Sequence, residues 1–286
     1  MFGPSFASLL ITAALALCSV AHAAPPKLGV QLWSVRNDLA KDYDGTLKRL
    51  AAAGVKGVEF AGFFGPYEKR LPDLKAKLDS LGMVAIGGHV KLAALADDTI
   101  EATVERYRQL GAHTLIVGYD ASGHDRTGVA TLAAALGRAA ERLKPHGMRT
   151  GYHNHDEEMA DVDGTTYWDM LARSSPKTVI LQQDVGWTTV AGKDPIEYVR
   201  RYPGRTYSTH YKALYPDSVK GKKRIIGQDI INWPALYEAN ASVGATEWLI
   251  VEQEDYPDGM SPTEAVEASI AGLRKVLRDV QPKPAL

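Results

Sequence analysis

The sequence predicts a single α/β domain with the fold of a (β/α)8 TIM barrel, and three observations support this prediction. First, one unit recurs along the chain: apolar residues at helical spacing lead into a glycine, and a short apolar strand follows. Second, strictly alternating helices and strands are typical of a parallel sheet. Third, eight strands within a few hundred residues indicate a closed barrel. A doubly wound open sheet is the alternative, but no G-x-G-x-x-G follows the first strand, which argues against a dinucleotide-binding fold.

The eight predicted strands follow one another in chain order. They are "KLGVQLW" (27–33), "VKGVEF" (55–60), "MVAIGGH" (83–89), "AHTLIVGY" (112–119), "MRTGYHNH" (148–155), "KTVILQQD" (177–184), "RTYSTHYK" (205–212) and "ATEWLIVEQE" (245–254). Five helical segments between them end in Gly54, Gly82, Gly111, Gly147 and Gly244, where we expect the left-handed residue that terminates a helix. A last helix is predicted near residues 261–279.

The first 23 residues are predicted to be a signal peptide and not part of the barrel. A long apolar segment runs into Ala21-His22-Ala23, an A-x-A pattern typical of cleavage before Ala24, although the usual basic region at the start is missing. The barrel then comprises residues 24–286, which are 263 residues without a cysteine. We therefore expect a periplasmic or secreted protein that needs no disulfide and has no membrane anchor after cleavage.

Charge and composition exclude some function classes. The chain carries 33 Lys and Arg against 34 Asp and Glu, so no basic excess points to nucleic acid. The one basic cluster, "VKGKKR" at 219–224, is interpreted as a solvated loop. The expected partner is a small molecule, and the sequence leaves the oligomeric state open, a homo-oligomer included.

Polar side chains end almost every predicted strand. In a TIM barrel the C-terminal ends of all strands meet at one mouth, where enzymes of this fold carry their chemistry. Because side chains two residues apart on a strand point to the same side, four consecutive strands can direct His153, Asp184, His210 and Glu252 to one point. Two imidazoles and two carboxylates suit one divalent ion, with Mn²⁺, Co²⁺ or Zn²⁺ favoured over Mg²⁺. The other residues expected around the mouth are Trp33, Glu59, His89, His155, Trp187, Lys212 and Glu254.

The strings "GVQLWSVR", "GVKGVEF", "GYHNHDEE", "QQDVGW", "STHYKA" and "IVEQE" resemble the xylose isomerase-like TIM-barrel family, over essentially the whole of residues 24–286. This family contains sugar isomerases and epimerases, inosose dehydratases and relatives of endonuclease IV. The likeness is greatest to its exported sugar phosphate isomerase/epimerase branch. In the family, strands 5 to 8 supply Glu, Asp, His and Glu to a divalent metal. Asp184, His210 and Glu252 match the last three, whereas His153 stands where ketose epimerases have a glutamate; Glu158 is the alternative first ligand.

The resemblance implies a metal-dependent sugar isomerase or epimerase, which abstracts a proton next to a metal-bound sugar carbonyl to form an enediolate. Lys212, His155 and Glu252 are the expected acids and bases, and we expect the ion to depress the pKa of Lys212. The resemblance also implies that Trp33 and Trp187 stack on the sugar, with packing at the barrel rim as the alternative. From their positions at the strand ends, Glu59, His89 and Glu254 are also expected to contact the substrate, with Glu59 alternatively a partner of Arg36. Two other functions stay open: a 3-keto-glycoside lyase or hydratase that cleaves by β-elimination, and a non-catalytic periplasmic sugar-binding barrel. The sequence names neither the sugar nor the metal.

Overall fold

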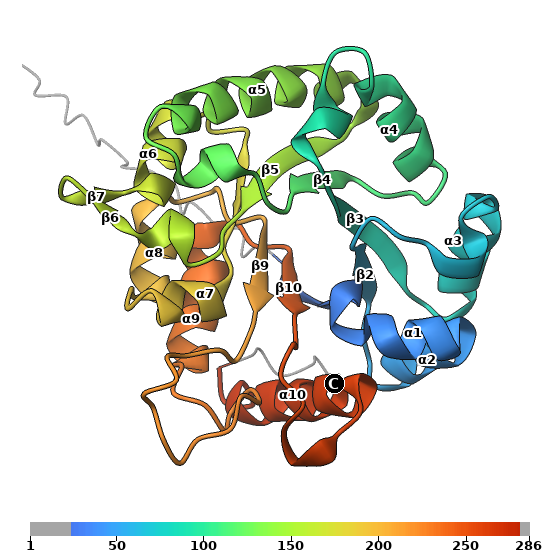
Figure 1. The fold of residues 1–286 in the computed structure, drawn as a ribbon. Helices are drawn as coiled ribbons and strands as arrows, with labels where there is room; N and C mark the ends of the chain where they lie inside the picture. Colours follow the sequence, from blue (N-terminus) through green and yellow to red (C-terminus); the bar gives the residue numbers. More distant parts are fainter. Residues whose placement is uncertain (1–23, 281–286) are drawn as a thin grey trace, which may run out of the picture.

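A barrel of parallel strands surrounded by helices makes up the protein (Figure 1). The computed structural model describes residues 24–280, so the predicted signal peptide lies outside the described residues. The eight barrel strands are β1 Lys27–Gln31, β2 Gly57–Phe60, β3 Val84–Val90, β4 Thr114–Val117, β5 Arg149–His153, β8 Ile180–Gln182, β9 Ser208–Tyr211 and β10 Trp248–Val251. Each lies within or at most one residue beyond its predicted range, and the predicted TIM-barrel fold is confirmed.

The strands are hydrogen-bonded in the order β8-β5-β4-β3-β2-β1-β10-β9, all in parallel. An isolated parallel bridge between Asp184 and His210 joins the two ends of this order and nearly closes the barrel. The closing bridge therefore places two of the four predicted metal ligands side by side.

Helices connect successive strands and pack on the outside of the barrel (Figure 1). They are α1 Arg36–Lys41, α2 Tyr43–Ala52, α3 Leu71–Ser80, α4 Ile100–Arg108, α5 Gly128–Leu143, α6 Tyr167–Ser174, α7 Val185–Val190, α8 Pro195–Arg201, α9 Trp233–Ala239 and α10 Pro262–Val276. A small antiparallel hairpin, β6 Asp161–Val162 and β7 Thr165–Thr166, precedes α6. The predicted last helix is α10, which begins at a capping box formed by Ser261 and Glu264. In the described part of the chain, no helix combines the length and apolarity that crossing a membrane requires.

Four of the five glycines predicted to follow helices do have the left-handed backbone: Gly54, Gly82, Gly111 and Gly147, with φ between 66° and 84°. Gly244 is the exception, and the left-handed residue there is Ala245, with φ 55°. The reason is that the chain after α9 winds as a wider π turn, Asn240–Gly244, which takes up one more residue before the chain leaves the helix.

Apolar packing fills the lower half of the barrel interior. Ile86, Trp248 and Ile250 form a small buried cluster that is separate from the large core between strands and helices. Gly57 makes room for it, since a Cβ at Gly57 would lie 2.7 Å from Ile86 and 2.8 Å from Trp248. Polar side chains fill the barrel above this cluster, so buried charges gather at the C-terminal end of the strands.

Candidate metal centre and active site

Four buried side chains converge at the C-terminal end of the barrel: His153, Asp184, His210 and Glu252. His153 is the last residue of β5, and His210 lies within β9. Asp184 caps the N-terminus of α7, where its Oδ1 accepts a hydrogen bond from the backbone N–H of Trp187 at 2.9 Å. Glu252 directly follows β10. One ligand atom from each of the four lies within 4.8 Å of the others, which is the spacing that a shared metal ion requires.

The donor atoms of this group fit a divalent cation. Asp184 Oδ2 and His153 Nδ1 are buried and make no hydrogen bond within the described structure. Burial raises the pKa of Asp184, and repulsion from Glu252 adds to the rise, although the Lys212 ammonium opposes it. Burial, with repulsion from His210 and His89, lowers the pKa of His153 well below its ordinary value and keeps the ring neutral. A neutral imidazole beside an unsatisfied carboxylate is the state that a metal ion binds.

Carboxylates hold both ring nitrogens of His210. Nδ1 lies 2.8 Å from Glu252 Oε2, and Nε2 lies 2.6 Å from Glu59 Oε2. Burial disfavours the charged ring, but the two carboxylates outweigh it and raise the pKa of His210 to about 10. Burial likewise disfavours charge on Glu252, yet Lys212 and His210 lower the pKa of Glu252 well below its ordinary value.

Glu59 lies completely buried and does not line the open mouth. Gln31 Nε2 donates to Glu59 Oε2 at 2.9 Å, and Gln182 Nε2 donates to Glu59 Oε1 at 2.8 Å. Burial opposes its charge, but His89 and His210 lower the pKa of Glu59 far below its ordinary value. This position favours a role in supporting His210 over direct substrate contact. Arg36, the alternative partner, instead donates to the carbonyl of Trp33 and stacks on its indole.

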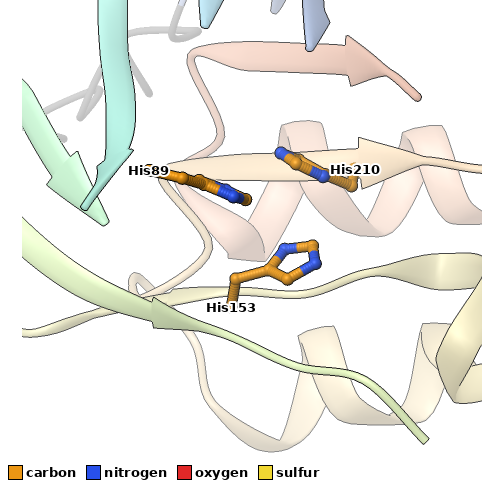
Figure 2. Close-up of side chains that lie close together, drawn as sticks. All are labelled: His89, His153 and His210. Carbon is orange, nitrogen blue, oxygen red and sulfur yellow. The ribbon is translucent and has the colours of Figure 1, made fainter. Parts of the chain in front are cut away.

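Three imidazoles from three strands meet in the barrel (Figure 2). His89 from β3 stacks on His210 with ring centroids 5.3 Å apart, and His153 lies 4.5 Å from His210 and 4.9 Å from His89. His89 Nε2 is 2.8 Å from Gln182 Oε1 and 3.3 Å from Glu59 Oε2. His89 is partly exposed, so it borders both the ligand group and the opening.

Lys212 is almost fully buried between three carboxylates. Its Nζ lies 2.7 Å from Glu254 Oε2, 3.2 Å from Asp184 Oδ2 and 3.3 Å from Glu252 Oε2. Burial disfavours the ammonium form, but these carboxylates raise the pKa of Lys212 well above its ordinary value. The sequence analysis expected a bound ion to depress the pKa of Lys212. It did not foresee that three carboxylates surround this side chain, and they shift its pKa in the opposite direction. In this structure the three carboxylates therefore favour the ammonium form of Lys212.

Charge in the site is unbalanced. Three buried carboxylates, those of Glu59, Asp184 and Glu252, and the exposed Glu254 surround Lys212 and His210. An excess of buried negative charge is costly unless a cation compensates it. The group therefore suits a divalent metal ion by its charge as well as by its donor atoms.

Aromatic side chains surround the opening above this group. His155 is half-buried, 5.1 Å from His153, 5.7 Å from Trp187 and 5.8 Å from Tyr119 between ring centroids. Trp33 is 41% exposed and donates from Nε1 to Glu254 Oε1 at 3.0 Å. His155 thus lies one layer further out than His153, as the alternation along the strand predicted.

The segment after β5 contains two anchors that sequence reasoning did not identify. Asn154 Oδ1 accepts from the backbone N–H of Asp184 at 2.9 Å, which fixes this ligand relative to β5. Glu158 is buried and accepts from Tyr152 Oη at 2.8 Å and from the backbone N–H of His155 at 2.7 Å. Glu158 is thus outside the group of four side chains that could share a metal ion, and His153 is within it.

Comparison with known sequences identifies the family. Residues 47–276 match the family described as "Xylose isomerase-like TIM barrel". The chain belongs to this family. An inosose dehydratase of Lacticaseibacillus casei is 26% identical over 152 residues, which cover 46% of this chain and 49% of that protein. The chain therefore matches only about half the length of this curated relative.

Solved structures share the fold at low sequence identity. A sugar phosphate isomerase/epimerase from Parabacteroides distasonis ATCC 8503 has a TM-score of 0.74 and 23% identity, covering 88% of this chain and 96% of that chain. The IOLI protein with a bound zinc atom has a TM-score of 0.64 and 13% identity, covering 86% of this chain and 98% of that chain. At these identities the likeness establishes the barrel, and the chemistry must be argued from the residues of this chain.

Proposed function

We propose that the protein is a divalent-metal-dependent enzyme that removes a proton next to the carbonyl of a sugar. The observation that carries this proposal is the buried group of His153, Asp184, His210 and Glu252, whose ligand atoms lie within 4.8 Å of one another. A divalent ion bound there would polarise a sugar carbonyl and acidify the neighbouring C–H. The zinc atom in the IOLI structure supports an ion of this kind, while Mn²⁺ and Co²⁺ suit the same donors.

The residues beside the ligand group supply the proton transfers. His155 lies one layer above His153, and its buried Nδ1 has no hydrogen-bond partner in the described structure, so this imidazole is the candidate base. Lys212, held beside Asp184 and Glu252 as an ammonium, can donate a proton to a sugar oxygen. Glu254 joins Lys212 to Trp33, so the acid is tied to an aromatic surface on which a sugar ring can pack.

Two outcomes can follow the first proton transfer. If the proton returns to carbon, the sugar is isomerised or epimerised; if a β-substituent leaves with a proton from Lys212, the sugar is dehydrated or a glycosidic bond is cleaved. The relatives named inosose dehydratase favour elimination, and the isomerase/epimerase from Parabacteroides distasonis favours reprotonation. The ammonium form of Lys212 supports elimination, because a leaving oxygen requires an acid.

The test of this proposal follows the reacting hydrogen. The protein loaded with Zn²⁺, Mn²⁺ or Co²⁺ is incubated in D₂O with unphosphorylated ketoses, inososes and 3-keto-glycosides, and products are identified by NMR. We expect deuterium at the carbon next to the carbonyl, in product or in recovered substrate. Product without deuterium at carbon would indicate direct hydride transfer between carbons and would contradict the proposal.

Metal analysis tests the ligand group independently of turnover. We expect Asp184→Ala and His210→Ala to lose the ion while their circular dichroism stays that of the wild type. Asp217→Ala, an exposed carboxylate away from the group, is the control and should retain it. Equal metal content in all four proteins would exclude this ligand assignment.

A further inference from the structure

A cavity of about 470 Å³ lies at the N-terminal end of the barrel strands. The segments that follow α5 and that lead into β5, β8 and β9 line it, and the lining residues include Lys144, Arg149, Lys177, Ile180, Arg205 and Tyr207. Arg149 begins β5 and His153 ends it, so four residues at ~3.3 Å each separate the cavity from the ligand group by about 13 Å. The cavity is therefore distinct from the site at the barrel mouth.

The side chains around this cavity carry an excess of positive charge. Four of the lining residues are cationic, namely Lys144, Arg149, Lys177 and Arg205, whereas Glu141 is the one carboxylate among the described residues of the lining. None of the four cations forms a salt bridge within residues 24–280. Glu247 lies beside the Tyr207 hydroxyl, outside the lining, and does not balance this excess. The cavity therefore attracts anions.

Arg205 is buried, and its charge has no acidic partner in the described structure. The guanidinium donates to the carbonyl of Val179 at 2.9 and 3.0 Å, to the hydroxyl of Ser175 at 2.8 Å and to the carbonyl of Ala172. Burial lowers the pKa of Arg205 to about 10, because the surroundings disfavour its charged form. The neutral acceptors hold the guanidinium in place but leave its charge uncompensated, so a nearby anion stabilises it.

Three exposed cations from three segments border the same cavity. The guanidinium of Arg149 packs over the ring of Tyr207 at 4.6 Å from the ring centroid, which limits the positions it can take. Lys144 caps the end of α5, and Lys177 lies in the turn before β8; both are exposed. Guanidinium and ammonium groups are the usual partners of phosphate oxygens, so this arrangement suits a phosphate-type anion.

The size and charge of the cavity limit its occupant. A volume of 470 Å³ corresponds to about sixteen water molecules at ~30 Å³ each, which is more room than a single phosphate ion needs. Salt at physiological concentration screens exposed charges, so an ion with one negative charge gains little from the exposed lysines. A compact molecule with two phosphate groups uses both the room and the several positive charges.

We propose that this cavity binds a small anion with two phosphate groups, held by Arg149, Lys144 and Lys177 at the end of the barrel away from the mouth. The bound anion compensates the buried charge of Arg205 and joins α5 to the segments before β5 and β8, so it stabilises the folded chain. It leaves the mouth open and does not compete with a substrate there. The inference does not depend on the proposed function.

Calorimetric titration of the purified protein in 0.15 M NaCl tests the cavity. The probes are pyrophosphate and fructose 1,6-bisphosphate, each compared with inorganic phosphate. We expect at least one of the two diphosphates to bind about tenfold or more tightly than phosphate and to raise the melting temperature. Tighter binding of pyrophosphate supports an inorganic ligand, and tighter binding of the bisphosphate supports a phosphorylated organic one.

Paired variants assign the binding to this cavity. Lys144→Gln together with Lys177→Gln should weaken binding of the diphosphate about tenfold or more, because two of the three exposed cations are lost. Lys220→Gln together with Lys222→Gln is the matched control, since it removes the same charge from the exposed basic segment 219–224. This control should keep the affinity within about twofold of the wild type.

A further variant separates this cavity from a metal ion at the mouth, to which a diphosphate could also bind. Asp184→Ala, which removes a predicted metal ligand, should retain the affinity for the diphosphate. Loss of affinity in Asp184→Ala, equal weakening by the two lysine pairs, or no preference for a diphosphate over phosphate would overturn the proposal and indicate an adventitious ion only. The proposed function is decided separately, by metal analysis and by the products formed in D₂O.

Discussion

His210 illustrates how single side chains set the chemistry of this site. Its ring is held between Glu59 on one side and Glu252 on the other. If Nδ1 binds the ion, Nε2–H donates to Glu59, and such a carboxylate orients the ring and raises its basicity. Glu59 is itself fixed by Gln31 and Gln182, so the support extends across the barrel.

We therefore predict that Glu59→Gln weakens metal binding by about 10- to 100-fold, the usual cost of losing the outer partner of a metal-bound histidine. Calorimetric titration with Zn²⁺ measures the effect. Glu158→Gln is the matched control, because Glu158 is an equally buried carboxylate that contacts Tyr152 and the backbone of His155 instead. Equal affinity in both variants and the wild type would remove Glu59 from this role.

A second prediction concerns the replacement of Lys212, the buried ammonium beside Asp184 and Glu252. Lys212→Met should retain the metal ion but lose about 10²-fold or more in turnover, the usual scale for loss of a general acid. The loss should fall on kcat more than on KM, because the proton is transferred in the reaction itself. Lys193→Met, which breaks only a pair with the exposed Asp161, is the control and should keep full activity. Full activity of Lys212→Met would show that another group donates the proton.

At the residue scale, the sequence predicted that His153, Asp184, His210 and Glu252 converge but not which side chains support them. Alternation along a strand is a period of two, so His153, His210 and Glu252 could be assigned to one space from their positions alone. The sequence does not indicate how deep along the barrel axis a side chain lies. Glu59 was therefore expected at the mouth of the barrel, although it is completely buried below the mouth. The charge state of Lys212 depends on Asp184, which follows β8, and on Glu252 and Glu254, which follow β10, and only the closed barrel brings these two strand ends to Lys212.

At the scale of elements, Asp169 joins two outer helices. Its side chain on α6 is 2% exposed and accepts bonds from Thr166 Oγ1 and from Arg201 Nη1, each at 2.9 Å, and from the hydroxyl of Tyr202. Burial disfavours the carboxylate, but these three donors lower the pKa of Asp169 below its ordinary value of 3.8. The ionised form of Asp169 is therefore more favourable in the folded protein than in the unfolded chain.

From this shift we predict an acid-sensitive contribution to stability. A carboxyl whose pKa is depressed by folding stabilises the protein fully above its unfolded value, and that stabilisation is lost as the pH falls through the folded value. Asp169→Asn should lower the free energy of unfolding by about 1–3 kcal/mol at pH 7 and by progressively less below about pH 4. Urea unfolding between pH 7 and pH 3 measures both differences.

The control for this prediction is Asp161→Asn. Asp161 is 74% exposed and pairs with Lys193, so its loss should cost less than about 1 kcal/mol at every pH. If the two variants behave alike, or if the effect of Asp169→Asn does not depend on pH, the contribution assigned to the buried pair is wrong.

Element boundaries were less predictable than element order. Each strand was recognised from its apolar run, and helix ends were located by glycines that adopt the left-handed backbone. At residues 240–244 the helix ends in a π turn, and the left-handed residue is Ala245 instead of the predicted Gly244. A prediction based on glycines alone could not locate this helix end. The apolar runs also extended beyond the hydrogen-bonded strands, because residues after a strand end still pack against the barrel.

At the scale of the whole molecule, the start of the barrel limits where the chain can be processed. β1 begins at Lys27, whose backbone N–H donates to the carbonyl of Glu247 at 2.8 Å. β1 also pairs with both β10 and β2, so it lies between two strands of the closed barrel. Cleavage after Ala23 would leave Ala24, Pro25 and Pro26 ahead of this strand, whereas cleavage within β1 would open the barrel.

We therefore predict that the full chain, expressed in a bacterial host with a periplasm, is exported and begins at Ala24 or at one of the two residues after it. The A-x-A pattern places the cut there, and the structure shows that all of these starts keep every hydrogen bond of β1. N-terminal sequencing of the periplasmic fraction measures the start. A variant that carries Ala21→Arg and Ala23→Arg, which spoils the small-residue pattern, is the control and should accumulate uncleaved. Recovery of the native chain with Met1 intact, in the cytoplasmic fraction alone, would contradict the export of this protein.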